Sequence, residues 1–414
     1  IPIHDSEYIT GLLVDQNICF GAISFNKKTG NRTVFLADAV VLATGGHTRI
    51  WRRSSSRKHE NHGDGLYLGL QAGCQLIDME MVQFHPTGML APDEYAGTLV
   101  TEAVRGEGGK LFNAKGERFM ERYDSERMEL STRDRVALAN YREISEGRGT
   151  PNNGVYLDIS HISKEVILDK LPRMYRQFME SQMLDISKSP MEVAPTAHYS
   201  MGGVVVEAET HATAVSGLYA AGECTSGVHG ANRLGGNSLA EILVFGKIAG
   251  EMAAEFSSEL HIQKRSRAVI KLANQELDDL TSNGEQLARP LQRAVRDLMW
   301  KYCGVLRSGE GLEEGLRQLM EIKEAAKDVD VRPSAEGFTD LALALDLLGS
   351  IDSAEATLRC AIERRESRGS HQRSDFTELS KDHDVNYVIN LESGNQVVSK
   401  HQVELLPADL EQAM

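Results

Sequence analysis

Two histidines stand beside glycine-containing turns and are candidates for binding an anionic substrate. His85 lies in the stretch VQFHPTG (82–88), and His198 lies in the stretch PTAHYSMGG (195–203). Proline pushes the residue before it towards extended backbone, so His85 is held in a restrained conformation. Taken alone, each imidazole fits a buried structural histidine with a hydrogen-bond partner at least as well as it fits a ligand contact.

Charged side chains and glycines crowd together in a further stretch. Residues 101–109 read TEAVRGEGG, in which two carboxylates and an arginine stand beside three glycines. A solvated loop would account for this composition, but glycines beside charges favour a close approach of the backbone to a ligand. Residues 131–135 read STRDR and predict the start of a helix, with the serine or the threonine as its cap. Taken alone, this second stretch is explained better by surface ion pairs than by a functional site.

A glycine-rich loop is predicted at 229–241, which reads HGANRLGGNSLAE and opens a helix. A helix N-terminus offers free backbone N–H groups and about half a positive charge, so it is a natural place for an anionic ligand group. Upstream, 217–223 (GLYAAGE) predicts a strand that ends in a turn carrying an acid. A plain connecting loop is the alternative for 229–241, and we consider it the weaker one.

The elements that must position these side chains follow from the hydrophobic pattern. Short β-type runs alternate with turns from 8 to 46 and predict a β-meander that leads into the apolar strand 39–46 (AVVLATGG). An apolar strand that stops on two glycines is typical of a buried parallel strand that meets a ligand. Residues 63–75 predict a loop that opens a helix.

The middle and the C-terminal parts of the chain have different patterns. The stretch from about 80 to 196 is polar and mixed, which predicts a separate insert domain. From 262 to 368 apolar residues recur at spacings of three and four residues and predict a helical bundle. One such series comprises Leu287, Leu291, Ala294, Leu298 and Tyr302. A turn at 393–395 (SGN) between two β-type runs predicts a terminal hairpin.

Composition excludes several classes of function. The chain carries 45 Lys and Arg against 60 Asp and Glu, a formal net charge of −15 at pH 7. An acidic surface repels phosphate backbones and lipid headgroups, so we expect no nucleic acid partner, and positive potential for an anionic substrate must be concentrated in a cleft. The five cysteines form no CxxC pair, so we expect reduced thiols and no disulfide or metal site. No apolar run reaches the roughly 20 residues of a bilayer span.

Taken in order, these motifs resemble the flavoprotein subunit of succinate dehydrogenase and fumarate reductase, and the likeness covers nearly the whole chain. Seven stretches carry it: 44–46, 63–65, 85–88, 101–109, 198–203, 222–223 and 229–241. L-aspartate oxidase is the near neighbour in the superfamily. Its corresponding loop usually reads Asn-Arg-Met-Ala-Ser-Asn-Ser, whereas 232–238 here reads NRLGGNS and is similar to the succinate/fumarate type.

The resemblance implies the fold class and its domains. We expect an α/β FAD-binding domain, present in part, with an inserted α+β capping domain, followed by a helical bundle domain and a short C-terminal β region. The implied boundaries are 1–80 and 197–258 for the FAD-binding domain, 81–196 for the capping domain, 262–370 for the helical domain and 371–414 for the C-terminal hairpin and tail.

The resemblance also implies roles for single residues. Four residues would hold the two carboxylates of a C4 dicarboxylate: His85, Thr101, His198 and Arg233. Arg133 would be the proton-transfer residue, with Glu102 and Arg105 as the relay to solvent. Seven residues would line the FAD: Gly45, Gly46, Asp64, Glu223, Asn237, Ser238 and Leu239.

The implied function is the interconversion of succinate and fumarate with FAD, with electrons leaving through an iron-sulfur partner subunit. The implied location is cytoplasmic, with any membrane contact made at the inner membrane through partner subunits. L-aspartate oxidase is one alternative. A truncated, non-catalytic remnant or assembly subunit is another.

Two departures from the family pattern stand out. The family opens with a strand, a GxGxxG turn and a helix, followed by a histidine that often links covalently to the flavin, and this chain has neither feature. The glycines at 106–109 and 309–311 do not follow a strand with the required spacing. We therefore expect either a fragment of a longer subunit or a truncated product. The stretch 47–60 is also more basic than the small-residue loop of the family.

Overall fold

The computed structural model describes residues 2–281, 284–332 and 338–403. Its first element is a three-stranded antiparallel sheet of β1 (Glu7–Asp15), β2 (Ile18–Asn26) and β3 (Arg32–Leu36). This sheet confirms the predicted meander. Leu13, Phe20 and Ile23 fill its buried face, and α8 (Arg267–Asp279) packs there through Val269 and Ile270.

The predicted parallel strand is present but shorter and less buried than expected. β4 (Val40–Leu42) pairs in parallel with β11 (Leu218–Ala220), and these two strands form a sheet of their own. Val41 is 39% exposed. The expectation of a buried strand over 39–46 was wrong for much of the stretch because, within the described residues, β4 has a strand partner on one side alone. Two helices follow these strands as predicted, namely α1 (Asp64–Gln71) and α7 (Asn237–Glu259).

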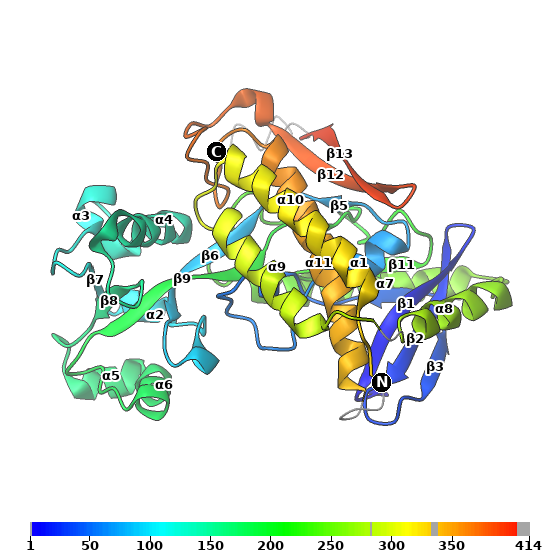
Figure 1. The fold of residues 1–414 in the computed structure, drawn as a ribbon, viewed down its shortest axis with the longest axis horizontal. Coiled ribbons are helices and arrows are strands. Elements are labelled where there is room, and N and C mark those ends of the chain that lie inside the picture. Colours follow the sequence, from blue (N-terminus) through cyan, green and yellow to red (C-terminus); the bar gives the residue numbers. More distant parts are fainter. Residues whose placement is uncertain (1, 282–283, 333–337, 404–414) are drawn as a thin grey trace.

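Residues 89–193 gather around a hydrophobic cluster of their own, and we call this part the capping body (Figure 1). Its antiparallel sheet has the order β6-β9-β8-β7. The strands are β6 (Val82–Met89), β7 (Lys110–Phe112), β8 (Val155–Asp158) and β9 (Met191–Ser200). The helices are α2 (Ala103–Gly106), α3 (Met120–Tyr123), α4 (Arg133–Glu143), α5 (Lys164–Lys170) and α6 (Pro172–Gln182). Figure 1 shows β6 and β9 running out of this body into the rest of the molecule.

The predicted helical bundle consists of α8, α9 (Ala288–Tyr302), α10 (Gly309–Ala325) and α11 (Thr339–Glu363). The hydrophobic core of the bundle also contains residues from the first part of the chain. Trp51 and Phe84 lie in the same buried cluster as Leu298, Leu312 and Leu358. The bundle therefore supports the strands that carry the candidate site. None of the helices within the described ranges is both long and apolar enough to span a bilayer.

The C-terminal hairpin is confirmed and joins a larger sheet. β12 (Val385–Glu392) and β13 (Asn395–Gln402) extend a sheet of order β10-β5-β12-β13, in which β5 (Leu76–Ile77) and β10 (Gly203–Val204) are short. The shorter helical turns are η1 (Thr48–Ile50), η2 (Asp93–Tyr95), η3 (Met128–Leu130), η4 (Ile144–Arg148), η5 (Ala326–Asp328) and η6 (Lys381–His383).

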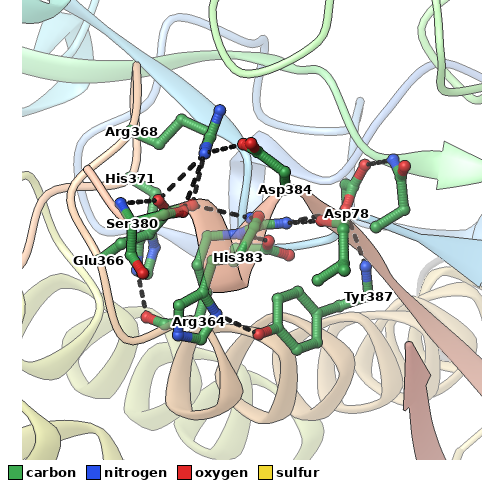
Figure 2. A network of polar contacts seen from close by, with 12 residues as sticks. Asp78, Arg364, Glu366, Arg368, His371, Ser380, His383, Asp384 and Tyr387 are labelled. Carbon is green, nitrogen blue, oxygen red and sulfur yellow. Dashed lines mark hydrogen bonds and ion pairs between the residues drawn. The ribbon is translucent and has the colours of Figure 1, made fainter. Parts of the chain in front are cut away.

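A buried ion cluster holds this C-terminal region to the core (Figure 2). The guanidinium of Arg364 lies 2.6 Å from Glu80, 3.0 Å from Glu366 and 3.2 Å from Asp78. Arg368 extends the cluster by contacts with Glu366. Arg364 and Glu366 are buried, so this cluster is a buried ionic link between α11 and the start of β6.

Candidate active site

The two candidate histidines lie on adjacent antiparallel strands. His85 on β6 pairs with Thr196 of β9, and the rings of His85 and His198 lie 5.3 Å apart between centroids. Nδ1 of His85 lies 3.2 Å from the backbone N–H of Thr87 and 3.3 Å from the carbonyl oxygen of the same residue, so its hydrogen bonds stay within its own strand. Nε2 of His85 is buried and has no hydrogen-bond partner. This ring nitrogen is therefore available to a ligand, and it is a donor in the tautomer that carries the ring proton on Nε2.

Both imidazoles are neutral near pH 7. Burial lowers the pKa of His198 to about 3, and the charges of Arg233 and Arg133 add to the effect. Burial also lowers the pKa of His85 well below its ordinary value. The hydroxyl of Ser55 lies 2.8 Å from Nδ1 of His198 and fixes the orientation of that ring. The pair can thus offer N–H donors to a carboxylate without carrying charge themselves.

Arg233 approaches the histidines from the glycine-rich loop that precedes α7. Its guanidinium lies over the ring of Tyr199, 4.2 Å from the centroid, and the residue is 4% exposed. Burial and the charge of Arg133 lower the pKa of Arg233. Its Nε is buried without a hydrogen-bond partner. It is a donor that a bound anion would satisfy, and the buried Nε2 of His85 is open to the same ligand.

Gln83 is a site residue that the sequence analysis missed. Its Oε1 accepts hydrogen bonds from Nη1 of Arg133 at 3.1 Å and from Nη2 of Arg233 at 3.2 Å. Its Nε2 donates to Asn232 at 2.8 Å and to the carbonyl of Arg233 at 2.7 Å. The available signal was its position two residues before His85 in a strand, the spacing at which side chains return to one face.

Arg133 begins α4 and is bonded to the predicted relay. Its Nε and Nη2 donate to Oε2 of Glu102 at 2.8 and 2.6 Å. Nη2 of Arg105 lies 3.9 Å from the other oxygen of Glu102. The side chain of Glu102 is 46% exposed and that of Arg105 is 1% exposed. Of these two residues, it is therefore Glu102 that reaches solvent. Thr101, next in the chain, lines a cleft beside this group.

Gly45 and Gly46 follow β4 and lie close to the side chains of Asn61 and Glu223, and Glu223 follows the parallel strand β11. A Cβ on Gly45 would overlap the side chain of Asn61, and one on Gly46 would lie 2.8 Å from Oε1 of Glu223. Glu223 accepts hydrogen bonds from the backbone N–H of Ser200 at 3.1 Å and from Asn61 at 3.3 Å. Burial raises the pKa of Glu223 to about 7. These close contacts mean that the turn has no room for side chains.

The N-terminus of α7 carries three residues that the resemblance places at the FAD, namely Asn237, Ser238 and Leu239. Gly236 is its N-cap, with φ of 88°, and makes no side-chain capping hydrogen bond. Leu239 in the first turn is 66% exposed, and Asn237 is also exposed, whereas Ser238 is half-buried. The loop before α7 lies against the relay, since a Cβ on Gly235 would be 3.2 Å from Nη2 of Arg133. The backbone N–H groups of Asn237 and Leu239 donate to carbonyls of the loop, so what this end of α7 offers a flavin is the positive end of the helix dipole and an exposed apolar residue.

Asp64 is the remaining residue that the resemblance places at the FAD. It begins α1, and the next residue, Gly65, packs against Thr44 at the end of β4. Burial raises the pKa of Asp64, and the charge of Asp346 on α11 adds to the effect. Asp64 thus adjoins the glycine turn through its neighbour and interacts electrostatically with α11.

Comparison with known proteins agrees with this arrangement. Residues 1–239 match the family described as "FAD binding domain", and residues 292–411 match "Fumarate reductase flavoprotein C-term". The chain is 43% identical over 400 residues to one of the subunits of the fumarate reductase (CoM/CoB) of Methanothermobacter marburgensis, covering 96% of this chain and 72% of that protein. It belongs to the flavoprotein subunit family of succinate dehydrogenase and fumarate reductase. Members of this family are FAD-dependent oxidoreductases, so FAD is the cofactor.

Other members of the flavoprotein subunit family give the same result. The succinate dehydrogenase flavoprotein subunit of Rickettsia conorii is 36% identical over 412 residues, covering 95% of this chain and 68% of that protein. Among solved structures, a variant of the E. coli quinol fumarate reductase flavoprotein has a TM-score of 0.90 at 33% identity, covering 97% of this chain and 72% of that chain. Together these matches show the expected fold of FAD-binding, capping and helical parts.

Proposed function

We propose that this protein interconverts succinate and fumarate. One observation carries the proposal: Arg133 and Arg233 share the acceptor Gln83, and their charges act on His85 and His198, whose rings lie 5.3 Å apart. These two arginines and two histidines come from four separate parts of the chain, and we call them the catalytic cluster. Several relatives are named succinate dehydrogenase or fumarate reductase flavoprotein subunits, which supports the same substrate pair.

The cluster suits a C4 dicarboxylate because it combines a guanidinium with neutral N–H donors. Arg233 can bind one carboxylate through two parallel hydrogen bonds. Nε2 of His85 and Nε of Arg233 are buried without partners, and carboxylate oxygens would satisfy both when the ring proton of His85 is on Nε2. We assign the remaining contacts to His198 and to the hydroxyl of Thr101. Such donors stabilise negative charge that grows on the carboxylate beside the reacting carbon.

The proton step is assigned to Arg133. Oxidation of succinate removes a hydride from one carbon and a proton from its neighbour. A free arginine has a pKa above about 12, so its use as a base requires an environment that disfavours its charge. Arg133 shares the acceptor Oε1 of Gln83 with Arg233, and it donates two hydrogen bonds to Glu102. Glu102 would pass the proton on to solvent, with Arg105 behind it.

Gly45, Gly46 and Glu223 at the glycine turn, with Asn237, Ser238 and Leu239 at the N-terminus of α7, would hold FAD. When bound, FAD supplies the hydride acceptor or donor. The positive end of α7 would favour negative charge on the cofactor. We keep Asp64 in this set as the start of α1, next to the turn.

We also propose that electrons leave through an iron-sulfur partner subunit, with any membrane contact made through partners and the flavoprotein itself on the cytoplasmic side. One solved relative is described in complex with UQ1 and another with menaquinol molecules. A quinone acceptor is consistent with this route.

The test is a pair of dye-linked assays on FAD-loaded protein, one with succinate and one with fumarate. We expect turnover in both directions and its loss in Arg133→Ala, with the flavin absorption band retained. Arg135→Ala is the matched control, since Arg135 lies on the same helix with its side chain 66% exposed. Peroxide production with aspartate instead of succinate would indicate L-aspartate oxidase. A protein that never acquires the flavin band would indicate a non-catalytic remnant.

A further inference from the structure

A cleft of about 1560 Å³ lies beside the candidate active site, and its lining is strongly cationic. Nine arginines and lysines face it, against three carboxylates. We call it the basic cleft. The whole chain carries a net charge of −15, so this concentration of positive side chains runs against the composition of the protein. It includes the arginines of 47–60, the stretch whose basic character the family pattern did not account for.

Within the described part of the chain, three of the nine cations of the basic cleft pair with a carboxylate, namely Arg52, Arg57 and Lys170. The positive charges of Arg49 and Arg296 are poorly compensated. Burial lowers the pKa of Arg49 to about 10, and the charge of Arg296 adds to the effect. Nε of Arg49 is buried and has no hydrogen-bond partner. Arg296 donates to backbone carbonyls of Trp51 and Arg52 rather than to a carboxylate. Neighbouring cations that lack anionic partners repel one another, and a bound anion would relieve that repulsion.

Both walls of the basic cleft contribute. Lys170 and Arg173 come from the capping body, whereas Arg293 and Arg296 come from α9 of the helical bundle. An anion between the walls would therefore be attracted from two sides.

The basic cleft also adjoins the catalytic cluster. Thr101 and Ser55 both line it, and the hydroxyl of Ser55 is 2.8 Å from Nδ1 of His198. A ligand that contacts Ser55 in the cleft would thus be linked to His198 through a single side chain.

We propose that the basic cleft is a second anion-binding site, which captures the dicarboxylate before it enters the catalytic cluster. This inference rests on the proposed function for the identity of the anion. A concave surface lined by one sign of charge focuses the field and raises the local concentration of oppositely charged ligand, with gains in association rate of about 10 to 10³-fold. A dianion responds to such a field about twice as strongly as a monoanion.

The test compares two double variants of the FAD-loaded protein. Arg173→Gln with Arg293→Gln removes one cation from each wall, and both residues are exposed. The matched control is Arg176→Gln with Arg289→Gln, which removes two exposed arginines from the same helices, α6 and α9, outside the cleft lining.

We expect the cleft variant to raise the KM for succinate about threefold to tenfold at about 20 mM NaCl with kcat unchanged. The difference should shrink to less than about twofold at about 500 mM NaCl, because salt screens exposed charges over a few ångströms. The control variant should match the wild type at both concentrations. Equal KM values for the cleft and control variants at low salt would overturn the proposal.

A second readout needs no turnover. Malonate has two carboxylates but no adjacent pair of C–H carbons, so it binds without reacting. Trp300 lines the basic cleft with Arg53 5.3 Å from its ring, so its fluorescence should report malonate there. We expect saturable binding that is weakened about threefold in the cleft variant, is unchanged in the control and persists in Arg233→Met. Loss of the signal in Arg233→Met would show a single site at the catalytic cluster. If the wild type bound malonate as expected but did not turn over succinate, the proposed reaction would be refuted and the anion-binding site would stand.

Discussion

Arg133 and Arg233, from α4 and from the loop before α7, donate to one shared acceptor, Oε1 of Gln83, at 3.1 and 3.2 Å. A neutral amide thereby holds two like charges at a fixed separation. The proton-transfer residue and the carboxylate-binding residue of the proposed mechanism are therefore positioned by the same side chain.

Replacing Gln83 with methionine keeps the volume and removes the shared acceptor. We expect Gln83→Met to lower kcat about tenfold to a hundredfold, because a small misplacement of catalytic groups has effects of this size. Steady-state kinetics on protein with matched flavin content checks it. Gln83→Glu keeps an oxygen for both guanidiniums and should retain more activity than Gln83→Met. Equal activity of wild type and Gln83→Met would refute the positioning role.

The glycine turn predicts an effect on cofactor binding. A Cβ on Gly46 would crowd Ser200 and Glu223, so Gly46→Ala should distort the turn and reduce the bound FAD. The ratio of flavin to protein absorbance measures this. Gly106→Ala is the control, because a Cβ at Gly106 would meet no atom within 4 Å. A full flavin complement in Gly46→Ala would argue against this site.

The imidazole rings of the histidine pair should remain neutral in mildly acidic solution. A free histidine titrates near pH 6.5, whereas burial lowers the pKa of His198 to about 3 and lowers that of His85 in the same direction. Carbon chemical shifts of labelled histidine, assigned with His85→Asn and His198→Asn, should show no titration of either ring between about pH 5 and 8. A midpoint near pH 6.5 for either ring would contradict the burial argument.

Glu143 should make the capping body sensitive to acid. Burial alone would raise the pKa of Glu143, but hydrogen bonds from Arg148, Asn113 and Tyr123 outweigh it and lower the pKa to about 2. A lowered carboxyl pKa contributes stability that is fully present above the ordinary value of 4.5 and is lost as the pH falls through about 2. The size is up to about 3 kcal/mol.

Urea unfolding at several pH values tests this contribution. Glu143→Gln should be less stable than the wild type at pH 7 by about 2 kcal/mol, and the difference should shrink as the pH falls below about 4.5. Glu146→Gln is the control, since the side chain of Glu146 is 53% exposed although it also contacts Arg148. A difference between Glu143→Gln and wild type that is constant with pH would show that charge is not its source.

The ion cluster of Figure 2 predicts a large loss of stability. Arg364→Met would leave Asp78, Glu80 and Glu366 together without their shared guanidinium. Removing one partner of a buried ion group costs about 3–5 kcal/mol. Denaturant unfolding measures it, with the exposed neighbour Arg365→Met as the control. Adding Glu80→Gln to Arg364→Met should restore part of the loss. A cost below about 1 kcal/mol would mean that the cluster is solvated in solution.

The sequence was most informative where structure is determined by local sequence patterns. The meander, the helix that begins at Asn237, the amphipathic helices and the terminal hairpin each have a periodicity or turn of their own. The candidate site residues were proposed by likeness to a family, and the structure brings His85, His198, Arg133 and Arg233 together. Their convergence could not be derived from spacing, because β6, β9, α4 and the loop before α7 meet only in the folded chain.

What the sequence did not predict depends on distant neighbours. Gln83 reads as an ordinary polar residue until two arginines from other elements reach it. Arg364 lies 286 residues from its partner Asp78, and no local pattern links them. The burial of β4 was overestimated for the same reason, since an apolar run reports hydrophobicity and not which strands flank it.

The two strands that carry the imidazoles, β6 and β9, also connect the capping body to the rest of the molecule (Figure 1). Their ladder is irregular between Gln83 and Phe84 and again between His85 and Gly88, at the level of the catalytic cluster. A tilt of the capping body would bend these two strands where their regular pairing is already interrupted, and the bend would displace His85. Opening a path for product and loosening the hold on its carboxylates would then be a single movement.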